Sequence, residues 1–243
     1  MRAMILAAGL GTRLKPITNN IPKALVKVGN TTLLEICINN LKLQGILDII
    51  INVHHFGAQI KNYLTENNNF GVNISISDET EKLLDTGGGL KKAAWFFDDG
   101  KPFLLHNVDV ISNLNLKTLY NYHINSNAIA TLAVRERRSS RHLLFNEKNI
   151  LCGWKNVKTN EIVSAADVKS VKEYAFSGIH IIDPKIFSLM PDDEVFSMID
   201  LYLKVMKIDS IYGYVDNDSF WMDVGNPKSL KLAEENYDKF MQL

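Results

Sequence analysis

The stretch that decides the fold lies near the amino terminus, where Arg2-Ala3-Met4-Ile5-Leu6 runs into Ala7-Ala8-Gly9-Leu10-Gly11-Thr12-Arg13. The apolar run before the glycine predicts a short buried strand. The two glycines let the backbone turn sharply and present its N–H groups outward, which suits a phosphate. The turn matches neither common phosphate motif, because Leu14 replaces the third glycine of the dinucleotide fingerprint and no Gly-Lys-Ser/Thr follows.

Strand-like and helix-like segments alternate outward from this turn through the first half of the chain. Apolar and β-branched runs predict strands over 47–53, 72–77, 102–105 and 128–134. Helical periodicity lies between them, over 58–64, 89–97 and 115–122, and a helix opens at Thr31 or Thr32 as cap. This alternation predicts βαβ units, and therefore an α/β fold with a mixed, mostly parallel central sheet flanked by helices.

The pattern changes after about residue 135. The apolar runs 143–145 and 150–151 flank the polar segment Asn146-Glu147-Lys148-Asn149, which predicts a hairpin. A strand over 174–182 follows, so we expect an antiparallel insertion over about 135–182. We then expect helices over 184–190 and 195–206, strands over 211–214 and 220–224, and a last helix from Pro227 to the C-terminus. No linker composition interrupts the chain, so one domain over 1–243 is the simplest interpretation.

Composition limits the classes of function. The 27 Lys and Arg residues balance 27 Asp and Glu residues, whereas nucleic-acid binders are usually basic. No apolar run approaches the ~20 residues of a membrane-spanning helix, so no membrane association is expected. Neither Cys37 nor Cys152 has a neighbour at metal-ligand spacing, which favours a reduced, cytoplasmic setting.

The loop that follows the glycine turn carries the most specific motif. Gly9-x-Gly11-Thr12-Arg13-x-x-Pro16-x-Thr18, followed by Pro22-Lys23, resembles the signature of the sugar-1-phosphate nucleotidyltransferases. The resemblance covers nearly the whole chain and implies a Rossmann-like, GT-A-like nucleotidyltransferase fold. It also implies that the turn from Ala8 and Gly9 to Gly11, Thr12 and Arg13 embraces a triphosphate, and that Lys23 contacts phosphates at the reacting centre.

Two aspartates end predicted strands and are candidate ligands for Mg²⁺, which prefers one or two carboxylates with phosphate oxygens and water. Asp109 follows the strand in His106-Asn107-Val108-Asp109, and Asp223 lies in Trp221-Met222-Asp223-Val224-Gly225. The family resemblance implies that both bind the metal, that Asp109 is catalytic with Arg13 and Lys23, and that Asn107 lies near the nucleotide. Val108 departs from the glycine usual in the family. His106, and His54-His55 after another strand, are candidate neighbours of the site.

The resemblance places the nucleobase near Glu79 and the run Thr86-Gly87-Gly88, where bare N–H groups precede a predicted helix. It places the sugar near Ser177 and Gly178. The family's Glu-Lys-Pro motif is absent, and Lys155 is the candidate to replace its phosphate contact. The arginines of 135–141 are either a solvated charge run or a basic lip for an anionic sugar.

The resemblance is strongest to short members, such as N-acetylmuramate-1-phosphate uridylyltransferases and mannose-1-phosphate guanylyltransferase-like proteins. It implies nucleotidyl transfer from a nucleoside triphosphate to a sugar 1-phosphate, with Mg²⁺ as cofactor, UTP as favoured donor and GTP next. A monomer or small homo-oligomer without a C-terminal β-helix domain is expected. The alternatives are a cytidylyltransferase for a phosphorylated alcohol such as phosphocholine, and a non-catalytic nucleotide-binding regulatory protein.

Overall fold

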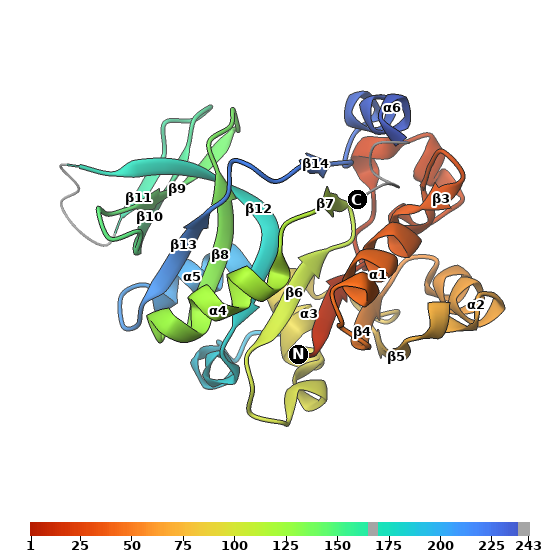
Figure 1. The fold of residues 1–243 in the computed structure, drawn as a ribbon, viewed down its shortest axis with the longest axis horizontal. Coiled ribbons are helices and arrows are strands. Elements are labelled where there is room, and N and C mark those ends of the chain that lie inside the picture. The colour runs from red at the N-terminus through yellow and green to blue at the C-terminus, as the bar shows by residue number, and fades with distance from the viewer. Residues whose placement is uncertain (165–169, 238–243) are drawn as a thin grey trace.

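A parallel four-stranded core forms one half of the structure, a computed structural model that describes residues 1–164 and 170–237. Its strands are β1 (Ala3–Leu6), β4 (Asp48–Val53), β5 (Asn73–Asp78) and β6 (Phe103–Asn107). They lie in the order β5-β4-β1-β6 (Figure 1). Their carboxyl ends therefore share one edge of the sheet, and the glycine turn leaves from the strand near its centre.

The long strand β12 (Lys172–Ile182) joins this core to an antiparallel half. Its last residues pair with β6, and its first residues pair with β9 (Arg141–Phe145). The sheet continues through β10 (Leu151–Asn156) and β11 (Ile162–Ser164). Strand β8 (Ala130–Arg135) pairs with the other side of β12 and runs parallel to β13 (Ile211–Val215). All of these strands belong to one mixed sheet.

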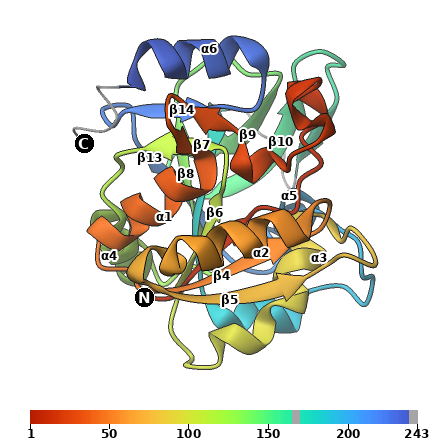
Figure 2. The same ribbon diagram turned by 90° about the vertical axis from the view of Figure 1, so that its right-hand side faces the viewer.

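Helices cover both faces of this sheet (Figures 1 and 2). The face with α1 (Leu33–Leu43), α2 (Gly57–Glu66) and α4 (Leu116–Ser126) buries Ile49 and Ile51 of β4. The face with α3 (Asp85–Lys92) and α5 (Met198–Val205) buries Ile50. Because successive strand residues point to opposite faces, a strand covered on both sides must be apolar throughout.

A third, smaller hydrophobic cluster packs α6 (Pro227–Glu235) beside the glycine loop. It joins this helix to the short pair β2 (Lys27–Val28) and β3 (Thr31–Thr32) through Val28, Leu14 and Leu230. A second short pair, β7 (Val110–Ser112) and β14 (Trp221–Asp223), lies below α6 in Figure 1. Single 3₁₀ turns complete the structure, at Thr12–Leu14, Ile17–Asn19, Lys23–Leu25, Asn68–Gly71, Ala94–Phe97 and Pro184–Leu189.

The structure confirms the predicted α/β class and most of the predicted elements. Thr32 caps α1 by accepting a hydrogen bond from the Glu35 amide at 3.1 Å. One prediction was wrong: α3 begins at Asp85 rather than Gly89, so the glycine run lies inside the helix. Strands β2, β3, β7 and β11 were not expected. The last helix ends at Glu235, and the final six residues, 238–243, lie outside the described part. None of the helices described is long and apolar enough to span a bilayer.

Candidate active site

The glycine turn has a backbone conformation that favours glycine at position 11. Gly11 has φ of 64°, in the left-handed region, and the Thr18 hydroxyl donates to the Gly11 carbonyl at 2.8 Å. A Cβ atom at Gly11 would lie 2.9 Å from Thr18 Cγ2. The loop from Thr12 to Lys23 thus folds back on the turn, which leaves Thr12 and Arg13 exposed above the buried Ala8.

Lys23 and Asp109 form an ion pair at the carboxyl end of β6. Their side chains are only 14% and 10% exposed, so this pair is largely shielded from water. Asp109 lies two residues after the end of β6, and its carbonyl oxygen accepts a hydrogen bond from the Val224 amide at 2.8 Å. That bond extends the β7–β14 pairing, in which Asp223 lies opposite Val110. The pairing brings two segments 114 residues apart to one place, as the metal-site prediction requires.

The side chains of Arg13 and Asp223 both lie beside Gly225. A Cβ atom built on Gly225 would lie 2.5 Å from both Arg13 Nη2 and Asp223 Oδ1, so only glycine leaves room for the two charged groups. Burial, and then the neighbouring Asp109, raises the pKa of Asp223, while Lys23 and Arg13 act in the opposite direction. Two carboxylates and two cations therefore share one small volume, and each carboxylate is electrostatically sensitive to the other.

The donor set fits a hard divalent cation. Asp223 Oδ1 is buried and has no hydrogen-bond partner, a state that is costly unless something binds there. Asp109 supplies a second carboxylate. In the part of the chain that the structure describes, no group of three or more His, Cys, Asp or Glu side chains gathers. Two carboxylates are sufficient when phosphate oxygens and water complete the shell of Mg²⁺.

Val108 is accommodated without strain. Its side chain is 4% exposed and packs in the core with Val110 and Leu104. The residue is not among those with a positive φ, so the β-branched side chain does not oppose the backbone. The departure from the family's glycine therefore leaves the position of Asp109 undisturbed in this structure.

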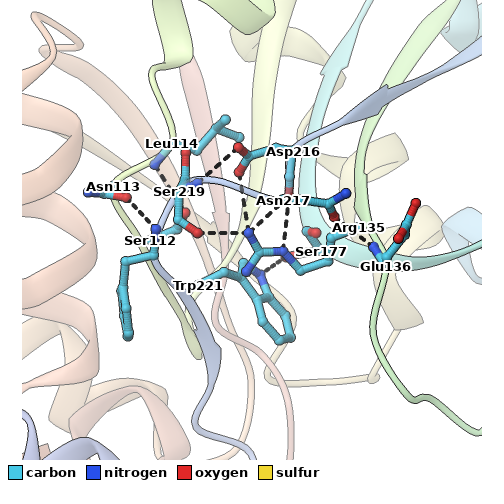
Figure 3. Close-up of polar contacts among 11 residues, drawn as sticks. Ser112, Asn113, Leu114, Arg135, Glu136, Ser177, Asp216, Asn217, Ser219 and Trp221 are labelled. Carbon is cyan, nitrogen blue, oxygen red and sulfur yellow. Dashed lines mark hydrogen bonds and ion pairs between the residues drawn. The ribbon is translucent and has the colours of Figure 1, made fainter.

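Arg135 ties the strand that carries Asp223 to the antiparallel half (Figure 3). Its Nη2 donates to the carbonyl oxygens of Asp216 at 2.9 Å and Ser219 at 2.7 Å, and lies 3.6 Å from Asp216 Oδ2. Trp221 Nε1 donates to the Ser177 carbonyl at 2.8 Å. These bonds fix the segment between β13 and β14. Trp221 and Gly225 belong to the motif around Asp223, and Arg135 to the arginine-rich segment 135–141, but their contacts could not be predicted because they depend on strand pairing.

Glu79 does not face a nucleotide, contrary to the sequence prediction. It is fully buried, and its carboxylate accepts hydrogen bonds from Asn52 Nδ2 at 2.7 Å and from the Leu84 amide at 3.3 Å. Asn52 Oδ1 in turn accepts from the Ala7 amide at 2.7 Å. Burial raises the pKa of Glu79, opposed by these hydrogen bonds. Glu79 therefore links the end of β1, β4 and the segment after β5 through buried hydrogen bonds.

The glycine run was expected to present bare N–H groups ahead of a helix, but it lies inside α3 and two of its amides are already paired. The amides of Gly87 and Gly88 donate to the Phe196 carbonyl at 2.9 and 3.1 Å. The Thr86 hydroxyl accepts from the Met198 amide at 2.9 Å. A Cβ atom at Gly88 would overlap the Glu194 carbonyl oxygen, so the glycines allow α3 to pack closely on the 194–198 segment.

The proposed sugar contacts separate into two places. Ser177 and Gly178 lie at a register shift of β12, where Gly178 has φ of 76° and approaches Asn107. They are therefore next to the end of β6. Lys155 instead lies on β10, where its Nζ bonds to Glu173 Oε1 at 2.7 Å. That carboxylate already satisfies the charge of Lys155.

The candidate histidines differ in exposure, because His106 is buried, His54 is half-buried and His55 is exposed. His106 is 1% exposed, and burial lowers its pKa to about 4, so it is neutral near pH 7. Its Nδ1 lies 2.8 Å from the Asn107 carbonyl oxygen. His54 Nδ1 lies 2.7 Å from the Glu79 carbonyl oxygen. His106 thus supports the end of β6 and is too deep to touch a substrate.

Comparison with known proteins places this geometry in a family. The nucleotidyl transferase family matches residues 2–239, and the chain belongs to it. N-acetylmuramate alpha-1-phosphate uridylyltransferase of Caulobacter vibrioides is 30% identical over 241 residues, which are 96% of this chain and 95% of that protein. Mannose-1-phosphate guanyltransferase of Yarrowia lipolytica is 31% identical over 94% of this chain, but this covers only 61% of its own length.

Solved structures show the same fold. HddC from Yersinia pseudotuberculosis, complexed with GMP-PN, aligns with a TM-score of 0.77 and 22% identity, over 97% of this chain and 99% of that one. The inositol-1-phosphate CTP transferase from T. maritima aligns with a TM-score of 0.79 and 17% identity, over 99% and 96% of the two chains. The chain is thus a nucleotidyltransferase of the GT-A-like fold.

Proposed function

We propose that this protein transfers a nucleotidyl group from a nucleoside triphosphate to a sugar 1-phosphate, with Mg²⁺ held by Asp109 and Asp223. The convergence of these two aspartates with Arg13 and Lys23, from four separate segments, carries the proposal. UTP is the favoured donor and N-acetylmuramate 1-phosphate the favoured acceptor. The support is the uridylyltransferase of C. vibrioides, which this chain matches over nearly the full length of both proteins.

The reaction needs charge compensation rather than a general base. An oxygen of the acceptor phosphate attacks the α-phosphorus of the triphosphate, the bond from that phosphorus to the bridging oxygen breaks, and pyrophosphate leaves. A phosphate monoester has a second pKa of about 6, so the nucleophile is already mostly dianionic near pH 7. Cys37 Sγ lies 3.5 Å from His106 Nδ1, but both side chains are buried and burial raises the pKa of the thiol, so this pair offers no reactive nucleophile.

Arg13 and Lys23 are the residues of the chain that supply positive charge to the phosphates. The exposed Arg13 guanidinium can donate two parallel hydrogen bonds to triphosphate oxygens. Lys23, now paired with Asp109, would add a point charge where the leaving pyrophosphate develops negative charge. A bound Mg²⁺ would neutralise phosphate charge between the two aspartates.

The cytidylyltransferase alternative for a phosphorylated amino alcohol would need an aromatic cage, and two of the three tryptophans are poorly placed to form one. Trp95 is 60% exposed beside Phe96. The Trp221 ring is covered by the Arg137 guanidinium, 4.3 Å from the ring centroid. A cation of the chain therefore occupies the face that a ligand ammonium group would need.

A pyrophosphate-release assay tests the proposal. The protein is incubated with Mg²⁺ and each of UTP, GTP, CTP and dTTP, against a panel of sugar 1-phosphates and phosphocholine. We expect release that requires a sugar 1-phosphate, and mass spectrometry should identify the matching nucleotide sugar. Nucleotide binding without release for any acceptor would instead support the regulatory alternative, and release with CTP and phosphocholine would support the cytidylyltransferase.

A further inference from the structure

A pocket of about 640 Å³ opens between the antiparallel half and α5. Trp154 and Phe176 supply aromatic surface to it, Asp85 and Asp200 supply carboxylates, and Arg137 and Arg141 supply positive charge. Pockets of this size hold small ligands, with apolar walls and a few polar groups that fix orientation. Aromatic surface with carboxylates is suited to a sugar ring, whose hydroxyl groups donate to carboxylate oxygens.

Arg137 lies between this pocket and the proposed transfer centre. We use that name for the site formed by Arg13, Lys23, Asp109 and Asp223. Its guanidinium lies over Trp221, two residues before Asp223, and its Nη2 donates to the Phe176 carbonyl at 2.9 Å. Burial lowers the pKa of Arg137, and the nearby Asp223 carboxylate acts in the opposite direction. The side chain thus lies between the pocket and a proposed metal ligand.

The charge of Arg137 is only partly offset, by the nearby Asp223 carboxylate. No ion pair joins it to an Asp or Glu of residues 1–164 or 170–237. Its Nε is buried and has no hydrogen-bond partner. Arg137 is half-buried, and a cation withdrawn from water without an ion-pair partner is costly. Arg135, by contrast, has Asp216. An anion that enters the pocket would remove this cost.

The acceptor phosphate is the anion that the reaction brings to this place. It must reach the α-phosphorus beside Asp223 while its sugar occupies space away from the triphosphate. Lys155, the cation expected for this task, is paired with Glu173 and does not line the pocket. Arg137 is therefore the cation placed between the two halves.

We infer that Arg137 binds the 1-phosphate of the acceptor while the sugar ring occupies the pocket formed with Trp154, Phe176, Asp85 and Asp200. The guanidinium fork matches two phosphate oxygens and keeps its bond to the Phe176 carbonyl. This inference rests on the proposed function. It assigns the acceptor side to a residue outside the family signature.

Three variants test the inference: Arg137→Gln, which removes the charge, Arg137→Lys, which keeps it without the fork, and Arg138→Gln as a control. Arg138 is the exposed neighbour, and its side chain does not line the pocket. Pyrophosphate release is measured with the best acceptor varied at saturating triphosphate, and then with the triphosphate varied at saturating acceptor. Melting temperatures are recorded for each variant.

Arg137→Gln should raise the KM for the acceptor about tenfold to a hundredfold, the cost of losing a charged hydrogen bond, with the KM for the triphosphate unchanged. Arg137→Lys should raise the acceptor KM by less, and Arg138→Gln should match the wild type. An unchanged acceptor KM, or an equal rise in both KM values, overturns the inference. If Arg137→Gln does not fold, the same split is decided on Arg137→Lys. A wild-type protein that uses no sugar 1-phosphate refutes the proposed function instead.

Discussion

The transfer centre and the acceptor pocket handle positive charge in opposite ways. In the transfer centre Lys23 is paired with Asp109, so the charges of the chain balance one another. In the acceptor pocket the half-buried Arg137 forms no ion pair with the described residues, and its Nε has no hydrogen-bond partner. A balanced pair can exchange partners when a metal and a phosphate enter together. An unbalanced cation requires its partner from the ligand.

The largest expected effect comes from breaking the balanced pair. Asp109→Asn removes one proposed metal ligand and frees Lys23, so turnover should fall about a hundredfold to a thousandfold, as when a main electrostatic contact to the transition state is lost. Steady-state pyrophosphate release measures this. Asp193→Asn, on an exposed loop, is the matched control and should retain full turnover. Near-wild-type turnover of Asp109→Asn would show that the pair is only structural.

The sequence predicted the transfer centre better than the acceptor pocket, for a physical reason. Arg13, Lys23, Asp109 and Asp223 lie in short motifs next to strand ends, and parallel strands bring their carboxyl ends to one edge. Arg137 carries no such motif. Its position depends on the β14–β7 pairing that holds Trp221, and on the bonds of Arg135.

The sequence misplaced Glu79 and the run Thr86-Gly87-Gly88 because it could not show what covers them. The segment 194–198 approaches from more than 100 residues away and takes the glycine amides. Glycines at a helix start fit both an open phosphate site and close packing. Glu79 is likewise hard to predict, because a charged residue is usually exposed. Here its carboxylate is buried and accepts a hydrogen bond from Asn52.

Glu79→Ala extends the comparison of the transfer centre and the acceptor pocket to a third site. It tests a buried carboxylate whose hydrogen-bond donors all come from the chain itself. Asn52 Nδ2 and the Leu84 amide would lose their acceptor, so the free energy of unfolding should fall by about 2 kcal/mol. Urea denaturation measures this, with the exposed Glu81→Ala as control. Unchanged stability together with a raised KM for the triphosphate would restore the nucleobase role that the sequence suggested.

Gly225→Ala tests whether Arg13 and Asp223 must both lie beside residue 225. The new methyl group would occupy space within 2.5 Å of both charged groups, so the flexible guanidinium should move aside. Turnover should fall about tenfold, since misplacing a positioning group by a fraction of an ångström is costly, while the melting temperature and acceptor KM stay near wild type. Lys228→Ala, an exposed neighbour, controls for the region. A selective rise in acceptor KM would instead place the acceptor phosphate on Arg13.

The smallest effect is a difference in pH response between the two regions. Burial and Asp109 raise the pKa of Asp223, so this carboxyl holds its proton to a higher pH than an ordinary aspartate. A cation must displace that proton, so its affinity should weaken as the pH falls, by at most about tenfold per pH unit below the pKa. Calorimetry with Mn²⁺ and no substrate, at pH 7.5 and 5.5, should show a few-fold loss. Asp223→Asn should reduce that dependence, and equal affinity at both values in the wild type would contradict it. Arg137 keeps its charge throughout this range, so acceptor binding should follow only the titration of the phosphate itself.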